Sequence, residues 1–153
     1  MVQEITLAMA GIDLHSVPPN VGEPPVPPET DAVYGLVDGQ HPIQVQFRAE
    51  PRLFFRLARN IMGREPEDEE EVREYAMEYF NVLCGRFLSE LYRMANIRVC
   101  NMTIPRYEIF PNVTRMAPNH IHSLYFVSDE QETVVFSWTA VSVEDMLRRN
   151  INV

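Results

Sequence analysis

Four residues in the middle of the chain have the spacing of neighbours on one face of a helix. Their offsets of four, three and four residues align side chains along a helix, and the row consists of Glu74, Glu78, Asn81 and Gly85. Inside a helix, an asparagine and a glycine each cost about 0.5–1 kcal/mol relative to alanine. The row combines carboxylates, which accept hydrogen bonds, with an amide that donates and accepts them. The spacing fits a polar functional site, and it also fits ordinary solvated residues.

The helix that would carry this row is the longest element that the sequence predicts. The acidic run Glu65 to Glu71 opens it, because negative charge near a helix N-terminus offsets the exposed amide dipoles, and the pattern continues to Asn96. About thirty residues at ~1.5 Å each span roughly 45 Å, so the helix must lie along the body of the domain. An apolar stripe on its other side is predicted to face the core: Val72, Ala76, Tyr79 and Leu83.

The remaining patterns predict strands and shorter helices around this long helix. Helices are expected over residues 2–12, 51–62 and 143–150, and strands over 32–37, 43–49, 97–104, 121–127 and 133–140. Pro51 suits a first helical position and Gly63 suits the position after a helix. Because the strands follow one another in hairpins with few crossovers, we predict an α+β fold with an antiparallel sheet packed against long helices.

A proline-rich stretch separates the first helix from the first strand. Six of the twelve residues from Val17 to Pro28 are proline, and proline cannot pair within a central strand. We expect a stiff connector over residues 17–30 within a single domain that spans residues 1–153. The spacing of Pro24 and Pro27 would also suit an SH3-type groove.

The composition excludes several classes of protein. All thirteen basic residues are arginine, which excludes chemistry that needs a lysine of this chain, such as an internal Schiff base or a P-loop. The net charge of -9 disfavours binding to nucleic acid. No apolar run approaches the ~18 residues of a membrane span, and the first residues lack a signal-peptide pattern, so we expect a cytoplasmic protein. Cys84 and Cys100 lack CxxC spacing and are expected to be reduced thiols.

The histidines offer a weaker alternative site. His120 and His122 alternate onto one face of a predicted strand and could bind a metal ion with His15 or His41 as a third ligand. The other interpretation is that they are polar residues on the outside of the sheet, with Ile121 directed inward. We expect no metal site in this chain.

The segment YAMEYFNVLCGRFLSEL, residues 75–91, resembles the E-x-x-N-x-x-x-G helix motif of the CheX and CheC family of chemotaxis phosphatases. The surrounding segments are similar as well: YGLVDG, IQVQF, FFRLARNIMG and an acidic spacer precede the helix, and Pro105 in MTIPRY follows it. The resemblance covers about residues 33–140. One copy of the motif makes the chain more similar to CheX than to CheC. Phe80 and Cys84 are larger than the residues expected beside the motif.

This resemblance implies hydrolysis of the aspartyl phosphate on a CheY-like response regulator in bacterial chemotaxis or two-component signalling. Asn81 would orient the attacking water, and Glu78 would dock the receiver domain by accepting hydrogen bonds from its lysine. Glu74 and Gly85 would lie at the contact. The receiver would supply Mg²⁺ and the lysine, so this protein would need no cofactor of its own.

Two alternatives use the same residues without catalysis. The chain could be a CheX-like module that binds a receiver domain or a chemoreceptor, which would follow if Phe80 and Cys84 kept Asn81 from projecting. It could also be a structural dimer subunit. The tendency of the family to dimerise through its sheet, together with the apolar strand predicted over 133–140, leads us to expect a homodimer.

Overall fold

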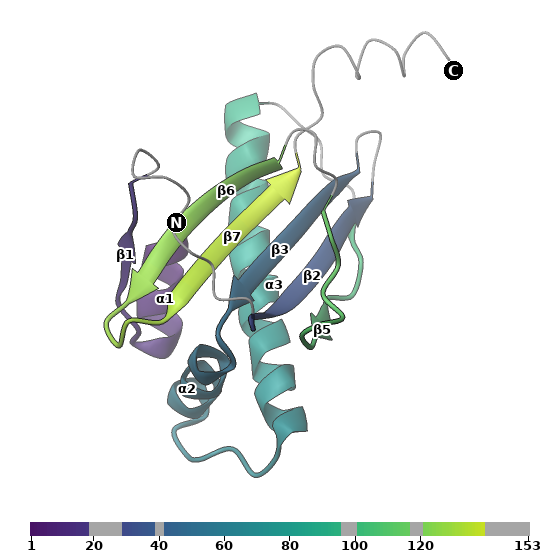
Figure 1. The fold of residues 1–153 in the computed structure, drawn as a ribbon. Helices are drawn as coiled ribbons and strands as arrows, with labels where there is room; N and C mark the ends of the chain where they lie inside the picture. The colour runs from purple at the N-terminus through teal and green to yellow at the C-terminus, as the bar shows by residue number, and fades with distance from the viewer. Residues whose placement is uncertain (19–28, 39–41, 96–100, 117–120, 140–153) are drawn as a thin grey trace, which may run out of the picture.

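The computed structural model describes residues 1–18, 29–38, 42–95, 101–116 and 121–139. In this part of the chain, a single sheet is backed by three helices (Figure 1). The helices are α1 (Val2–Ala10), α2 (Pro51–Met62) and α3 (Glu69–Ala95). The strands are β1 (Leu14–Ser16), β2 (Asp31–Asp38), β3 (Ile43–Ala49), β4 (Asn101–Met102), β5 (Arg106–Glu108), β6 (Ile121–Ser128) and β7 (Thr133–Thr139).

Every strand pair in the described sheet is antiparallel. The strand order is β1-β6-β7-β3-β2-β4, and β5 also pairs with β2. α3 lies behind the sheet, and α2 lies near its lower end (Figure 1). This arrangement confirms the predicted α+β fold, with an antiparallel sheet packed against helices. No helix in the described ranges is long and apolar enough to cross a membrane.

Most of the predicted elements are present, with small shifts at their ends. The patterns over 2–12, 32–37, 43–49, 51–62, 121–127 and 133–140 correspond to α1, β2, β3, α2, β6 and β7. The sequence does not predict β1 and β5, and of the predicted strand 97–104 the described residues form only β4. Most of the proline-rich connector and the predicted helix 143–150 lie outside the described residues. The single domain over residues 1–153 stays a prediction.

The ends of α2 follow the local sequence signals. Pro51 occupies the first turn, where a missing N–H leaves no hydrogen bond unmade. Gly63 ends the helix in the left-handed region, at φ 75°, and its N–H donates to the carbonyl of Arg59 at 2.9 Å. Glycine adopts this conformation without the steric penalty of a Cβ, so the helix ends where the sequence predicts.

The start of α3 differs from the prediction. The helix begins at Glu69 rather than at Glu65, because the first acidic residues form the capping turn. The Asp68 carboxylate accepts a hydrogen bond from the N–H of Glu71 at 2.9 Å, which is the bond made by an N-cap residue. The Glu71 carboxylate in turn accepts the N–H of Glu67 at 2.7 Å and pairs with Arg64.

The core lies between the sheet and the helices and is rich in aromatic rings. Phe47 of β3 contacts Phe54 of α2 and Tyr79 of α3 edge to face, with ring centroids 5.8 and 5.4 Å apart. Such pairs add to the gain from burying apolar area. On β3, alternate residues face the helices, and those between them, Gln44, Gln46 and Arg48, lie on the outer face of the sheet.

A glycine in β2 allows α3 to approach the sheet. A Cβ built on Gly35 would lie 3.0 Å from Cε1 of Phe80 and 3.4 Å from Sδ of Met102. The fully buried Phe80 ring therefore occupies the space that a side chain at position 35 would fill. This contact fixes the distance between β2 and the middle of α3.

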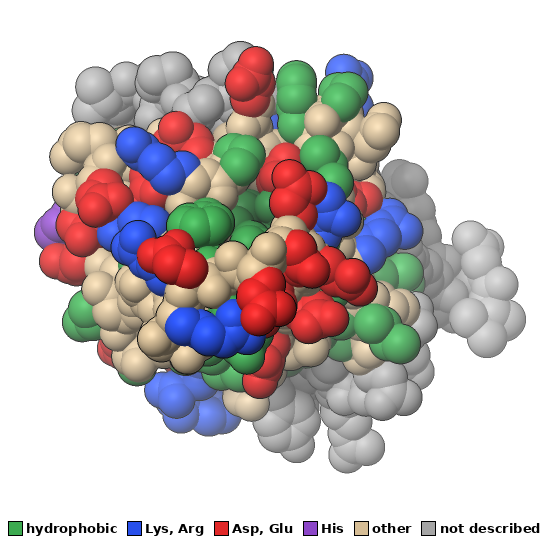
Figure 2. All heavy atoms as spheres, turned by 90° about the horizontal axis from the view of Figure 1, so that it is seen from below, with side chains coloured by type: hydrophobic (Ala, Val, Ile, Leu, Met, Phe, Trp, Pro, Cys, Tyr) green, Lys and Arg blue, Asp and Glu red, His purple; other side chains and the backbone are tan. Residues whose placement is uncertain are grey.

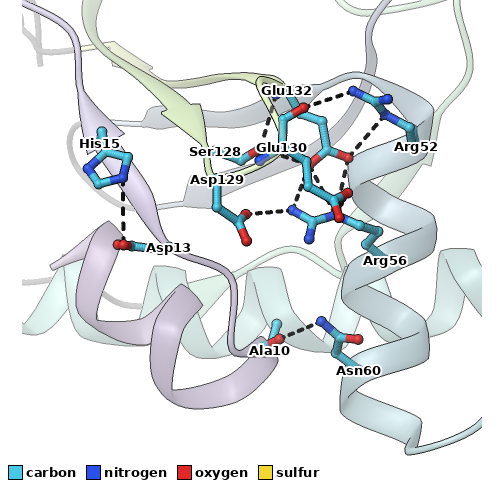
Figure 3. Close-up of polar contacts among 10 residues, drawn as sticks. All are labelled: Ala10, Asp13, His15, Arg52, Arg56, Asn60, Ser128, Asp129, Glu130 and Glu132. Atoms are coloured by element: carbon cyan, nitrogen blue, oxygen red, sulfur yellow. Dashed lines mark hydrogen bonds and ion pairs between the residues drawn. The ribbon is translucent and has the colours of Figure 1, made fainter.

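Arg56 ties α2 to the turn between β6 and β7 (Figure 3). Its Nη2 lies 2.8 Å from Asp129 and 2.7 Å from Glu132, and its Nε lies 3.0 Å from Glu130. Glu132 is fully buried and also accepts a hydrogen bond from the Ser128 hydroxyl at 2.8 Å. Burial disfavours the charge on Arg56, but hydrogen bonds to Glu132 and Asp129 raise its pKa above the usual value. We call these five residues the Arg56 cluster.

Candidate functional site

The four residues singled out by their spacing lie together on the exposed face of α3. Glu74, Glu78, Asn81 and Gly85 are all exposed, whereas Tyr79 on the opposite side of the helix is fully buried. We call these four residues the polar ridge. The structure thus places all four residues of the row on one face of a single helix.

The polar groups of the ridge are available to another molecule. Within the described ranges, the side chains of Glu74, Glu78 and Asn81 have no hydrogen bond or ion pair. Elsewhere on the helix, charged side chains pair with one another, as Arg86 does with Glu90 at 3.4 Å. The ridge therefore presents two carboxylates and an amide to solvent without internal competition for their hydrogen bonds.

Phe80 and Cys84 do not crowd the amide of Asn81. Both side chains point into the core and are fully buried, whereas Asn81 is exposed. Burial raises the pKa of the Cys84 thiol, so the unreactive thiol form dominates at neutral pH. The larger residues beside the motif are therefore accommodated inside the protein, in part by Gly35.

Gly85 has no packing reason to be glycine in the described structure. A Cβ at this position would meet no atom within 4 Å, so among the described elements none crosses the helix closely there. The Ser89 hydroxyl donates a hydrogen bond to the Gly85 carbonyl at 2.9 Å. A glycine in a helix interior costs about 1 kcal/mol relative to alanine, and nothing in the described fold offsets this cost.

Comparison with known protein families gives the family of this chain. A family model described as chemotaxis phosphatase CheX matches residues 33–121, which include all of α3 and the ridge. This chain belongs to the CheX family. The sequence-based resemblance is thereby confirmed. Among curated protein sequences, none matches the chain.

Solved CheX structures share the fold of this family member. CheX from Vibrio vulnificus has a TM-score of 0.65 at 18% identity, over 90% of each chain. CheX from Desulfovibrio desulfuricans has a TM-score of 0.70 at 13% identity, over 89% of this chain and 91% of the other. A complex of CheX and CheY with BeF3 and Mg²⁺ from Borrelia burgdorferi has a TM-score of 0.63 at 13% identity, over 89% of this chain and 90% of the other.

The two described histidines, His15 and His122, lie apart in this CheX-family fold. His122 lies on the helix side of the sheet, where its ring stacks on Trp138 at 5.5 Å, and Ile121 lies on the outer face. This is the reverse of the predicted orientation. In the strand register, His15 lies opposite Val127 of β6. Val127 is five residues from His122, so the two histidines are roughly 17 Å apart along the strand direction. The described residues contain no group of three or more potential metal ligands, and positions 41 and 120 lie outside them.

A surface cavity at the start of α3 was not predicted from the sequence. It has a volume of about 360 Å³ and lies where α2, α3 and β5 meet, at the end of the molecule shown in Figure 2. Val72, assigned to the core stripe, is only half-buried and lines this cavity. The Tyr107 hydroxyl donates to the Asp31 carboxylate at 2.7 Å, and Arg73 pairs with Glu69. These polar groups have internal partners, unlike those of the ridge.

Proposed function

We propose that this protein hydrolyses the aspartyl phosphate of a CheY-like response regulator in bacterial chemotaxis or two-component signalling. The observation that carries the proposal is the pair Glu78 and Asn81, which lie exposed on one face of α3 without partners in the described structure. Membership of the CheX family supports a phosphatase. The Borrelia burgdorferi CheX complex with CheY supports a receiver domain as the partner.

Asn81 would position the attacking water. Its amide oxygen can accept a hydrogen bond from water while its NH₂ donates another, which aims a water lone pair at phosphorus. The bond from water oxygen to phosphorus forms as the bond from phosphorus to the aspartyl oxygen breaks. The products are a free aspartate carboxylate and inorganic phosphate, and the water proton passes to phosphate or solvent. Phosphoryl transfer of this kind depends mainly on positioning and charge stabilisation.

Glu78 would fix how the helix docks on the receiver. Its carboxylate can accept charge-assisted hydrogen bonds from a lysine of the partner, and it lies one turn before Asn81. The helix itself is held by Tyr79, Phe80 and Leu83, all fully buried. This anchoring matters because a displacement of about 1 Å in a positioned group can lower a rate by ~10²-fold.

Glu74 and Gly85 would extend the contact on either side of this pair. Glu74 adds a second carboxylate one turn earlier, and Gly85 leaves open space for the backbone of the partner. The receiver would supply Mg²⁺, which neutralises charge on the phosphoryl oxygens. This chain would contribute only the amide, the carboxylates and the shape of the helix.

A non-catalytic CheX-like module that binds a receiver or a chemoreceptor is the second candidate, because the same exposed ridge would suffice for binding. A test for multiple turnovers distinguishes the phosphatase from the binding module. A cognate receiver is phosphorylated in Mg²⁺, and this protein is added at one fiftieth of its concentration. For a phosphatase, phosphate release accelerates and exceeds the amount of added protein many times. Binding without acceleration would establish the module instead.

We also propose that the protein is a homodimer. β7, the apolar strand expected to favour association, is paired on both sides, with β3 and β6. Its edge is therefore occupied, and association would have to use the outer face of the sheet or the short strands at its margins. Light scattering over a range of concentrations tests this: a mass twice that of one chain is expected, and the mass of one chain at all concentrations would contradict it.

A further inference from the structure

The outer face of the sheet, which faces away from the helices, contains a further cavity. It has a volume of about 540 Å³ and lies between strands β3, β6 and β7 and the segment 110–116. α3 and its ridge lie behind the sheet, on the other side (Figure 1). We call this space the outer-sheet cavity. Its size is within the range of ~300–1,000 Å³ typical of small-molecule sites.

Arg48 lines this cavity and lacks a counter-ion in the described residues. Its Nε and Nη2 donate to the Thr30 hydroxyl oxygen at 3.1 and 2.8 Å. A guanidinium has five N–H donors, so three are without a partner in the part of the chain that the structure describes. Burial lowers the pKa of Arg48, which reflects the cost of removing this charge from water.

Most of the other arginines in the described ranges have a carboxylate partner, and the two exceptions, Arg93 and Arg115, are exposed. Seven of those in the described ranges lie within 4.0 Å of a carboxylate: Arg52, Arg56, Arg59, Arg64, Arg73, Arg86 and Arg106. Most of these are exposed, and exposed ion pairs contribute little. Arg48 is half-buried, so a counter-ion would stabilise it more than it stabilises an exposed arginine.

The rest of the cavity is both polar and apolar. Ser123 and Ser137 share a hydrogen bond between their hydroxyls at 2.8 Å, and hydroxyls can rotate to offer a further donor or acceptor. Val135, Phe110 and Met116 supply apolar surface. Binding sites for small organic molecules commonly combine apolar walls with a few polar groups that fix orientation.

We propose that the outer-sheet cavity binds a small organic anion, a molecule with a carboxylate or phosphate group and an apolar part. The anionic group pairs with the free N–H donors of Arg48, and the apolar part packs on Val135 and Phe110. The serine hydroxyls offer hydrogen bonds to the same ligand. This site is independent of the phosphatase proposal, since it shares no residue with the polar ridge.

NMR titration of the full, isotope-labelled chain tests this site with three probes. Phenyl phosphate and benzoate carry the two candidate anionic groups, and benzyl alcohol is the uncharged control. We expect saturable shifts of the Arg48 Nε–H and of the Ser137 and Val135 amides with at least one anion, and at least tenfold weaker binding of benzyl alcohol. The ratio of the two anion affinities tells which anionic group the cavity prefers.

Three variants test whether anion binding depends on Arg48. Because a hydrogen bond to a charged group contributes about 1.5–3 kcal/mol, we expect R48Q to weaken anion binding by ~10-fold or more. R59Q, which changes a partly exposed arginine on α2 outside the cavity, should bind as the wild type does. N81A should also bind normally, which separates this site from the ridge. If R48Q does not fold, the Arg48 Nε–H shift in the wild-type chain remains the deciding measurement.

Three results would overturn the proposal. The first is the absence of saturable shifts with both anions, as would occur if another part of the chain or a second copy filled the cavity. The second is anion binding that R48Q leaves unchanged. The third is loss of anion binding in N81A, which would move the site to the ridge.

Discussion

The Arg56 cluster and the polar ridge use similar chemical groups in opposite ways. In the cluster, a buried arginine is surrounded by Asp129, Glu130 and Glu132, with contacts of 2.7–3.0 Å (Figure 3). On the ridge, carboxylates and an amide extend into solvent with no partner in the described structure. The cluster joins α2 to a distant hairpin, whereas the polar side chains of the ridge join no other element of the described structure.

This difference separates residues that hold the fold from residues that are free to act on a partner. A buried polar group must be satisfied internally, since an unpaired one costs several kcal/mol. An exposed group on a rigid helix has no such requirement, so its type is not dictated by folding. Asn81 and Gly85 even lower helix propensity, which fits a role outside the fold.

The largest expected effect is on stability, from loss of the arginine in the cluster. R56M leaves the fully buried Glu132 without its closest cation, and breaking a buried ion pair in this way costs about 3–5 kcal/mol. Urea unfolding of R56M and of the wild type measures this loss of unfolding free energy. R86M is the matched control, because its pair with Glu90 is exposed and worth at most about 0.5 kcal/mol. Equal losses of unfolding free energy in R56M and R86M would show that the buried cluster stabilises the fold no more than an exposed ion pair does.

Gly35 tests the packing that supports the ridge from inside. In G35A the new methyl group lies 3.0 Å from the ring of Phe80, and overpacking of a core typically costs about 1–3 kcal/mol. The expected result is a lower unfolding free energy, together with slower dephosphorylation of the receiver if α3 shifts. Unchanged stability would show that the sheet and α3 can separate without cost.

Gly85 should show stability and function moving in opposite directions. G85A places a methyl group in open space on the helix and should stabilise the protein by up to about 1 kcal/mol. The same methyl group should weaken binding to the phosphorylated receiver, because it occupies the space left for the partner. Chemical denaturation and calorimetric titration measure the two effects. A gain in stability with unaltered affinity would exclude Gly85 from the contact.

A smaller effect is expected on the unfolding free energy at acid pH. The hydrogen bond from Arg56 lowers the pKa of Asp129 in the folded protein, so folding favours its ionised form. The stability this adds is present above the unfolded pKa, near ~3.9, and is lost as pH falls through the lower folded pKa. Unfolding free energies measured from pH 6 to pH 2.5 should therefore fall less steeply in R56M than in the wild type. Parallel curves would contradict this linkage.

The sequence predicts the ridge well because the signals that define it are local. Helical periodicity gives the face of α3 that carries Glu78 and Asn81, and Pro51 and Gly63 give the ends of α2. The acidic run misleads by four residues, since the same carboxylates that favour a helix N-terminus also form the turn that caps it. The residue at which the helix begins depends on the hydrogen bond that the N–H of Glu71 donates to the Asp68 carboxylate.

The features that the sequence misses depend on distant partners. β1 and β5 have three residues each and exist only by pairing with β6 and β2. The orientation of His122 follows from its register opposite Trp138, which alternation along one strand cannot supply. Likewise, the different roles of Arg48 and Arg56 depend on whether a carboxylate lies nearby in the fold, and charge patterns along the chain carry no such information.

The most direct test of the central claim is the rate of receiver dephosphorylation by N81A. We expect a rate at least ~10²-fold below that of the wild type, with retained binding to the phosphorylated receiver and an unfolding free energy equal to that of the wild type or up to about 1 kcal/mol higher, since alanine favours a helix more than asparagine does. N112A, which alters an exposed asparagine away from α3, should keep the wild-type rate. A wild-type rate in N81A would contradict the claim that this amide positions the attacking water.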